Sequence, residues 1–311
     1  MISNRRLGFT IVELIVVIAI IGVLVAILYP ALTGARTRAK KVKELNLISH
    51  VGKAWSMYSM GHQDKLLPGY ISTDVQAYKD QAWAFPDETL IPPAPDYEDN
   101  VPNEAGPWTW RLLDYLDYDW RSLLFYRDTE WTSNELREHA DVIATQPAFG
   151  YNGFYIGGWW EIDVHENRPV VTFGSVELTD GRRINVVTTQ ASKLLKADNQ
   201  IVFCSTFYAE EGLYYELDDD TPGTHFAIPS ILARVQKWTP LLGGEIDARF
   251  DTYAPLGRFN GIPAICFADG SSRTIEIEKL LDQELWIPKA QPVGDIPANE
   301  FSHTICGQAF R

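Results

Sequence analysis

The sequence predicts an α+β fold, in which a long N-terminal helix precedes a head of short helices, strands and extended loops. An almost uninterrupted apolar run from Phe9 to Tyr29 is followed, beyond Pro30, by apolar residues at helical spacing up to about Gly61. From Ala148 onward, aromatic and β-branched residues alternate with glycine or polar residues, which is the pattern of strands. A chain of 311 residues has room for one large domain or two ordinary ones.

Charge is distributed unevenly along the chain. The net charge is −14, yet the clustered basic residues lie near the N-terminus, at Arg5, Arg6, Arg36, Arg38, Lys40, Lys41 and Lys43. The remainder is therefore acidic, which argues against nucleic-acid binding by the head, because phosphates require a basic surface. An acidic surface is typical of a soluble head outside a membrane.

Three cysteines, Cys204, Cys266 and Cys306, are few for this length and form no Cys-x-x-Cys pair. A structural zinc site or a thioredoxin-type motif is therefore not indicated. In an oxidising compartment the three thiols allow one disulfide and one free cysteine, in any of the possible pairings. They are equally compatible with three small buried apolar side chains.

Residues 9–29 form the most informative segment. Glu13 is the only charged residue in it, and no proline occurs before Pro30. A helix of this length spans roughly 30 Å, the thickness of a bilayer core. Basic residues flank the segment on both sides, so the positive-inside rule leaves its orientation open.

Two ordinary explanations fit this segment poorly. A secretory signal peptide has a shorter apolar core, followed by a small-residue cleavage site. A plain signal anchor gives no reason for Glu13, since a carboxylate in hydrocarbon is costly unless it is paired. The sequence therefore predicts a partner for Glu13.

The run Gly8-Phe9-Thr10-Ile11-Val12-Glu13-Leu14, followed by the apolar stretch, resembles the processing site of type IV pilins and type II secretion pseudopilins. The resemblance implies that a membrane-embedded prepilin peptidase cuts after Gly8 and methylates the new amino terminus at Phe9. It implies that Glu13 pairs with the terminal amine of a neighbouring subunit during filament assembly. It also implies that Pro30 lies where the helix bends or melts in the filament, although the residues alone indicate only that the membrane span ends there.

This resemblance sets the expected organisation of the chain. We expect a leader at 1–8, a transmembrane and filament-core helix at 9–30, an amphipathic continuation at 31–61 and a head at 62–311. The expected location is the inner, cytoplasmic membrane, crossed once, with the head periplasmic or extracellular and the chain in a filament after assembly. The expected partners are prepilin peptidase, other pilin or pseudopilin subunits and the inner membrane, and no nucleic acid.

Beyond Pro30 the helical pattern resumes with an apolar stripe, formed by Leu45, Ile48, Val51, Gly52, Trp55, Met57 and Tyr58. We expect this stripe to pack on the head, with Glu44 and the lysines between its members on the polar face. The resemblance implies that the packing partner is an antiparallel sheet.

The first part of the head, residues 62–107, contains seven prolines and many acidic residues. Prolines at this density exclude a regular helix or a central strand, so we expect a long loop or insertion. Leucines and tryptophans at three- and four-residue spacing predict one or two short helices in residues 106–126. Residues 133–143 predict another helix, with Ser133 as a cap.

Later segments predict strands, at 149–164, 170–172, 183–187 and 200–204. The clearest hairpin lies in residues 263–277, because Asp269-Gly270 separates two apolar-alternating runs.

The segment around this hairpin, residues 258–273, resembles the C-terminal Asp-Gly motif of a large class of bacterial pilin-like proteins. The matching residues are Asn260, Gly261, Asp269 and Gly270, and the stretches 108–116 and 149–154 also resemble that class. The class usually has a histidine ten positions before the aspartate, where this chain has Phe259. A histidine-dependent role is therefore not expected here, whereas the hairpin is.

No enzyme motif was found in the sequence. There is no nucleophile elbow, phosphate-binding loop or His-Glu-x-x-His, and the six histidines lack metal-ligand spacing. Calcium is the one cofactor considered, since carboxylates are suitable ligands. The acidic run at Asp218, Asp219 and Asp220 lacks the spacing of an EF-hand, so a solvated turn is favoured, and the group Asp96, Glu98, Asp99 and Glu104 has the same weakness.

The leading hypothesis is a structural filament subunit of a type IV pilus-like or type II secretion system. A head of about 250 residues favours a minor or specialised subunit over a major one. The alternative is a membrane-anchored module that recognises glycans or another partner on a pilin-like stalk. Its candidate contact residues are Trp83, Phe85, Trp159 and Trp160.

Overall fold

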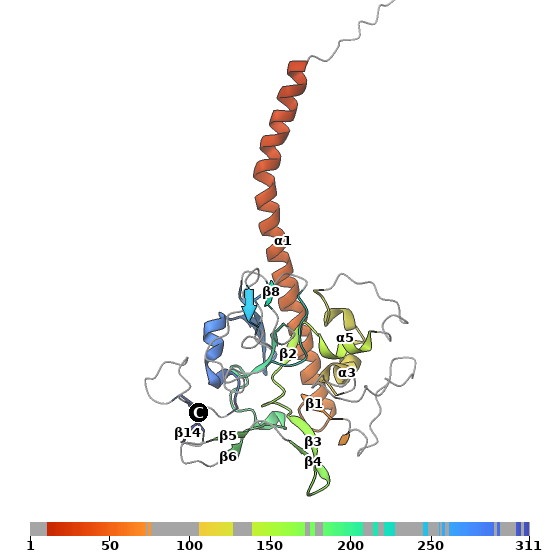
Figure 1. Cartoon of the computed structure of the whole chain (residues 1–311), viewed down its shortest axis with the longest axis vertical. Coiled ribbons are helices and arrows are strands. Elements are labelled where there is room, and N and C mark those ends of the chain that lie inside the picture. Colours follow the sequence, from red (N-terminus) through yellow and green to blue (C-terminus); the bar gives the residue numbers. More distant parts are fainter. Residues whose placement is uncertain are drawn as a thin grey trace, which may run out of the picture. The chain divides into compact units, whose positions relative to one another are not determined.

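The computed structural model describes fifteen stretches of the chain. They are residues 11–72, 74–75, 106–126, 139–171, 175–177, 183–207, 214–216, 221–227, 245–247, 255, 257–258, 261–288, 291–292, 303–305 and 308–310. The chain divides into two compact units, Met1–Lys43 and Glu44–Arg311. The described part of the first unit belongs to helix α1, and the second unit, the head, contains the end of α1 and all the described strands (Figure 1).

Helix α1 runs without interruption over 51 residues, Ile11–Gly61, and ends where the apolar pattern predicts. Its head portion buries one face, made of Glu44, Ile48, Val51, Gly52, Ala54, Trp55, Tyr58 and Ser59. The predicted stripe is therefore largely confirmed, since Leu45 also packs against this core.

Two members of the predicted helix faces lie elsewhere. Met57 is 52% exposed, because it is two positions from Trp55 and so points to a different side of the helix. Glu44 was expected on the polar face but is fully buried. It accepts a hydrogen bond from the Ser205 hydroxyl at 2.6 Å, which offsets part of the cost of burying a carboxylate.

The largest sheet has four antiparallel strands in the order β11-β10-β7-β2. They are β2 (Phe149–Tyr151), β7 (Ile201–Ser205), β10 (Ala264–Phe267) and β11 (Ser272–Thr274). The hairpin predicted at Asp269-Gly270 is confirmed, since β10 and β11 pair across it. Gly270 has φ +83°, a conformation that glycine adopts without strain.

One face of this sheet packs on the head portion of α1. Trp55 donates a hydrogen bond from its indole nitrogen to the Tyr151 hydroxyl at 3.0 Å. A Cβ atom at Gly52 would lie 2.2 Å from the Cys266 Sγ, so glycine at this position makes room for the Cys266 side chain between the helix and β10. The fold is therefore the expected long helix packed on an antiparallel sheet.

A second sheet has the order β1-β3-β4. Its strands are β1 (Tyr70–Ile71), β3 (Trp159–Asp163) and β4 (Arg168–Val171). The two-residue β1 lies at the edge of the sheet and runs parallel to β3. Of residues 62–107, the structure describes only 62–72, 74–75 and 106–107, so the expectation of a long loop or insertion there stays a prediction.

The remaining described strands form smaller groups. β5 (Ser175–Glu177) pairs with β6 (Arg183–Asn185), and β8 (Tyr214–Glu216) pairs with β9 (Glu245–Asp247). A three-stranded group contains β12 (Gln291–Pro292), β13 (His303–Ile305) and β14 (Gln308–Phe310).

Short helices complete the head. They are α3 (Trp108–Leu113), η1 (Asp114–Leu116), η2 (Trp120–Ser122), α5 (Ala140–Thr145), η3 (Ala191–Lys193), η4 (Ile277–Leu281) and η5 (Gln283–Leu285). The helices expected in residues 106–126 are confirmed, and their tryptophans are buried, as predicted. The helix expected at 133–143 is observed from Ala140, and its predicted cap Ser133 lies outside the described residues.

The register of the main sheet constrains the cysteines. Cys204 lies opposite Ile265, so the two side chains share one face of the sheet. Cys266 follows Ile265 directly in the strand and therefore points to the other face, so the two thiols lie on opposite faces. Both are buried and free. A Cys204–Cys266 disulfide is therefore ruled out, and both behave as small buried apolar side chains, while Cys306 lies outside the described residues.

Candidate functional site

The first candidate site is the N-terminal end of α1. Gly8 and Phe9, the expected cleavage and methylation positions, lie outside the described residues. Glu13 lies in the first turn of the helix. The partial positive charge at a helix N-terminus favours a carboxylate there. The helix thus carries Glu13 at a defined place, four residues after the expected new amino terminus.

The surface of α1 that follows Glu13 is apolar and open. Every residue from Ile11 to Arg36 is exposed. Among the described residues, α1 is the one helix long and apolar enough to cross a membrane, and none of its most apolar stretch is buried. An apolar surface of this size requires a partner such as lipid or another protein.

Pro30 does not break the helix in this chain. A proline removes one backbone donor, yet α1 continues as an α-helix on both sides of it. The Thr33 hydroxyl donates to the Tyr29 carbonyl at 3.0 Å in the turn that follows. Pro30 therefore lies within a continuous helix in the single chain. That the helix bends or melts there in the filament, or that the membrane span ends there, stays a prediction.

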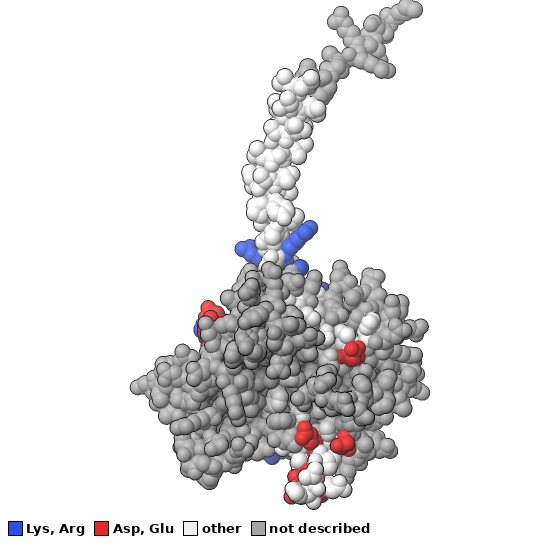
Figure 2. All heavy atoms as spheres, viewed as in Figure 1, with Lys and Arg blue, Asp and Glu red and all other residues white. Residues whose placement is uncertain are grey.

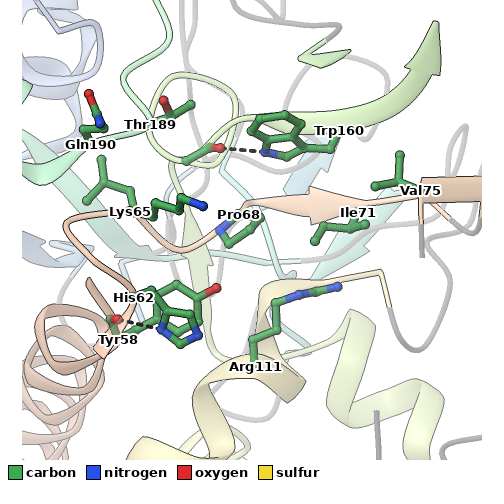
Figure 3. A pocket seen from close by; sticks show the side chains of 12 residues that line it. Tyr58, His62, Lys65, Pro68, Ile71, Val75, Arg111, Trp160, Thr189 and Gln190 are labelled. Carbon is green, nitrogen blue, oxygen red and sulfur yellow. Dashed lines mark hydrogen bonds between the residues drawn. The ribbon is translucent and has the colours of Figure 1, made fainter. Parts of the chain in front are cut away.

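The second candidate site is a cavity of about 350 Å³ in the head (Figure 3). It lies between the end of α1, the segment after it, helix α3 and strand β3. Its lining residues are Tyr58, His62, Lys65, Leu66, Pro68, Ile71, Val75, Arg111, Gly157, Trp160, Thr189 and Gln190.

Aromatic stacking and backbone contacts shape this cavity. The rings of Tyr58 and His62 stack with centroids 3.9 Å apart. Trp160 donates from its indole nitrogen to the Gly157 carbonyl at 2.9 Å. Gly157 has φ +78°, and a Cβ there would lie 1.7 Å from the Leu67 carbonyl oxygen, so only glycine fits.

Arg111 supplies a buried positive charge beside the cavity. Its guanidinium donates to the carbonyls of Gly106 and Pro107, each at 2.8 Å. Burial lowers the pKa of Arg111 to about 10, so the group stays protonated at neutral pH. The cavity therefore combines apolar walls with one guanidinium.

The structure separates the four aromatic residues proposed for recognition. Trp160 lines the cavity. Its neighbour Trp159 points to the other side of β3, where it stacks on Tyr70 at 4.1 Å and on Phe154 at 5.4 Å. Trp83 and Phe85 lie outside the described residues. Sequence reasoning found Trp160 but missed the rest of the cavity, which comes from five separate stretches of chain.

The Asp-Gly motif has a clear local role in the structure. One oxygen of Asp269 accepts a hydrogen bond from the Ser271 backbone nitrogen at 2.8 Å, and the Asp269 backbone nitrogen donates to the Ala197 carbonyl at 3.0 Å. These contacts close the turn and dock it on a neighbouring loop. Gly261 has φ +69°, whereas Asn260 and Phe259 lie outside the described residues.

The sequence alone assigned no role to Arg258, the first residue of this motif. Its side chain is fully buried and donates to the carbonyls of Thr221 and Thr206, at 2.5 and 3.0 Å. Its guanidinium also lies over the Tyr126 ring, 4.8 Å from the centroid. Arg258 thus ties together three distant segments, and an arginine beside the Asn-Gly pair was the available signal.

The structure does not test the acidic candidates for calcium. Asp218, Asp219, Asp220 and the group from Asp96 to Glu104 lie outside the described residues. Within the described stretches, no cluster of three or more histidine, cysteine, aspartate or glutamate residues has the geometry of a metal site.

The geometry defines a class of chain, in which an exposed apolar helix continues into the core of an α+β head. Its N-terminal segment matches the prokaryotic N-terminal methylation motif over residues 3–29. The matched range includes Gly8, Phe9 and Glu13 and ends just before Pro30. The comparison with curated proteins found no match, and neither did the comparison with solved structures.

The motif supports three statements about the chain. It indicates a pilin- or pseudopilin-like subunit processed by prepilin peptidase. It is typical of structural, non-enzymatic proteins. Together with the apolar helix, it fits membrane anchoring before assembly.

Proposed function

We propose that the chain is a structural subunit of a type IV pilus-like or type II secretion pseudopilus filament. Prepilin peptidase cuts it after Gly8 and methylates Phe9. Before assembly the helix crosses the inner membrane once, with the head on the periplasmic or extracellular side. The Asp269-Gly270 hairpin supports placing the chain in the large pilin-like class that carries this motif.

One observation carries this proposal: the first half of α1 is an exposed apolar helix with a single carboxylate, Glu13, near its start. Lipid covers such a surface before assembly, and the helices of other subunits cover it afterwards. In either setting Glu13 is in a low-dielectric medium, where pairing with an amine is strongly favoured. The amine released at Phe9 of a neighbouring subunit is such a group.

Cleavage is tested with the full chain in cells that contain a prepilin peptidase. Gly8→Leu should leave the leader attached, so that N-terminal sequencing starts at Met1 rather than at Phe9. Gly34→Leu is the matched control, because the same change lies in α1 with nothing within 4 Å of the new Cβ. Normal processing of the Gly8 variant would contradict the proposal.

Assembly is tested separately with Glu13→Leu. This variant should be cut normally but should be missing from pelleted filaments, because the carboxylate that pairs with the amine is gone. Glu13→Gln keeps the side-chain shape and removes the charge, so it should fail in the same way. Assembly of either variant at the wild-type level would overturn the role of Glu13.

A second candidate function, partner or glycan recognition by the head, is supported by the cavity beside Trp160. A half-exposed tryptophan next to hydroxyl and amide groups suits a sugar ring, and here Thr189 and Gln190 supply those groups. The test is glycan-array binding by a soluble fragment from about residue 36. Trp160→Ala should abolish binding, whereas Tyr118→Ala, an exposed aromatic away from the cavity, should leave it unchanged.

A further inference from the structure

A band of cations follows the apolar half of α1. Five basic residues lie within eight positions, and no acidic residue occurs between Leu14 and Lys43. We name this set the basic collar; it consists of Arg36, Arg38, Lys40, Lys41 and Lys43. All are exposed except Lys41, which is half-buried. Figure 2 shows basic side chains projecting from the helix directly after its apolar surface.

The collar surrounds the helix rather than following one face. Successive residues of an α-helix are turned by about 100°. Arg36, Lys40 and Lys43 therefore share one side, while Arg38 and Lys41 lie on the other. A charge distribution of this kind fits a surface that the helix crosses, better than it fits a partner lying along one side.

The distance from the apolar segment fits the headgroup layer of a membrane. At about 1.5 Å per residue, Arg36 lies roughly 10 Å beyond Tyr29 along the axis, and Lys43 roughly 20 Å. The headgroup layer is about 5 to 8 Å thick, and charges act for about 8 to 10 Å further in physiological salt. Long basic side chains also bend toward the interface, which extends their reach.

We propose that the basic collar binds anionic lipid headgroups, of the phosphatidylglycerol type, in the leaflet from which the helix emerges. This inference rests on the membrane-anchored stage of the proposed function. Binding fixes the depth of the helix and holds the chain at the membrane surface. The head needs such a contact, because residues 44–311 hold 20 of the 27 basic and 40 of the 41 acidic residues, a net charge of −20 that anionic lipid repels.

By charge alone, the basic collar could also bind the acidic head of a second copy of the chain. The lipid surface is favoured because the collar follows the apolar segment directly along the helix and encircles the axis just beyond the headgroup layer, within the range over which its charges act. Anionic lipids attract basic residues beside a membrane span in this way.

The test uses the full chain reconstituted in nanodiscs that contain phosphatidylethanolamine and a minority of phosphatidylglycerol. Native mass spectrometry then measures the ratio of the two lipids that remain bound after release. The wild type should be enriched in phosphatidylglycerol by roughly fivefold, the effect of one such contact. The enrichment should fall as the salt concentration rises.

Three variants isolate the collar. Changing its five residues to glutamine should return the bound lipid ratio to that of the bulk. The matched control removes five exposed charges from the head, by changing Lys53, Arg168, Lys193, Lys196 and Lys279 to glutamine, and should keep the wild-type enrichment. The double variant Arg36→Lys with Arg38→Lys retains the positive charge and should also retain the wild-type enrichment.

Each outcome separates the inference from the proposed function. A collar variant with wild-type enrichment overturns the inference, and if that variant also fails to form filaments, the collar binds acidic heads instead. A wild-type chain that enters nanodiscs without enrichment overturns the inference alone. A chain that does not enter nanodiscs at all overturns the membrane-anchored stage as well.

Discussion

The two halves of α1 belong to one helix but differ in what their apolar side chains pack against. Residues 11–36 are all exposed, although most are large and apolar. Residues 44–61 bury a continuous face against the head, with Ile48 and Val51 fully inaccessible. The first half therefore needs a partner outside the chain, whereas the second half already has one.

This difference teaches that hydrophobicity alone does not define a core. In the first half, apolar residues occur on all sides of the helix, so no single side is marked out for packing. The second half has a stripe, and contacts such as Trp55 with Tyr151 lock it to the sheet. All ten tryptophans follow Lys43, so tryptophan fluorescence reports unfolding of the head alone.

The largest expected effect comes from the same substitution in both halves. Ile48→Ala should lower the free energy of unfolding of the head by about 2 to 5 kcal/mol, because it leaves a cavity in a packed core. Ile18→Ala, at a position that is 58% exposed, should change it by less than about 0.5 kcal/mol. Urea titration of the full chain in detergent, followed by tryptophan fluorescence, measures both. Equal losses would show that the two halves are not independent.

Glycine substitutions sharpen the comparison. Gly52→Ala places a Cβ 2.2 Å from the Cys266 Sγ and should destabilise the head by about 1 to 3 kcal/mol. Gly22→Ala, which has nothing within 4 Å, should leave the unfolding of the head unchanged. The same urea titration distinguishes them.

Cys266→Ala tests the cause of the Gly52 effect. It removes the Sγ atom and leaves the Cys266 Cβ at an ordinary 3.7 Å from the new methyl group. The double variant should therefore lose less stability than the sum of the two single variants. Strictly additive losses would mean that the sulfur atom is not the obstacle.

Features set by local rules could be predicted from the sequence. The length of α1 follows from apolar spacing, and the β10–β11 hairpin follows from Asp269-Gly270 between alternating runs. The processing motif is also local, since Gly8, Phe9 and Glu13 lie close together in the chain.

Features set by long-range contacts could not be predicted. The burial of Glu44 depends on Ser205, which is 161 positions away. The cavity needs Tyr58, Arg111 and Trp160 to meet from separate segments. The opposite orientations of Cys204 and Cys266 require the register of β7 and β10, which the sequence does not specify.

Acid should affect the head through His225. Burial lowers the pKa of His225 to about 3, well below its unfolded value of about 6.5. Between these two values the unfolded chain binds a proton that the folded chain does not. Above pH 6.5 neither state binds this proton, so His225 does not lower the free energy of unfolding. As the pH drops from 6.5 toward 3, that free energy falls by up to about 1.4 kcal/mol per pH unit.

The measurement is the unfolding free energy of wild type and His225→Gln between pH 7 and pH 4.5. The difference between the two curves should shrink as the pH falls, because glutamine does not titrate. A constant offset between the His225 variant and the wild type would contradict the assignment.

The smallest expected effect concerns the carboxylate that the second half of α1 buries. Ser205→Ala removes the hydroxyl that donates to Glu44 at 2.6 Å and should lower the unfolding free energy of the head by about 1 to 2 kcal/mol. Ser56→Ala is the matched control, because its hydroxyl bonds only to the helix's own Gly52 carbonyl, and alanine favours a helix. If both variants cost the same, the Glu44 contact adds nothing specific. A larger cost for Ser205 shows that a polar contact, as well as apolar packing, distinguishes the half of α1 that has found its partner within the chain.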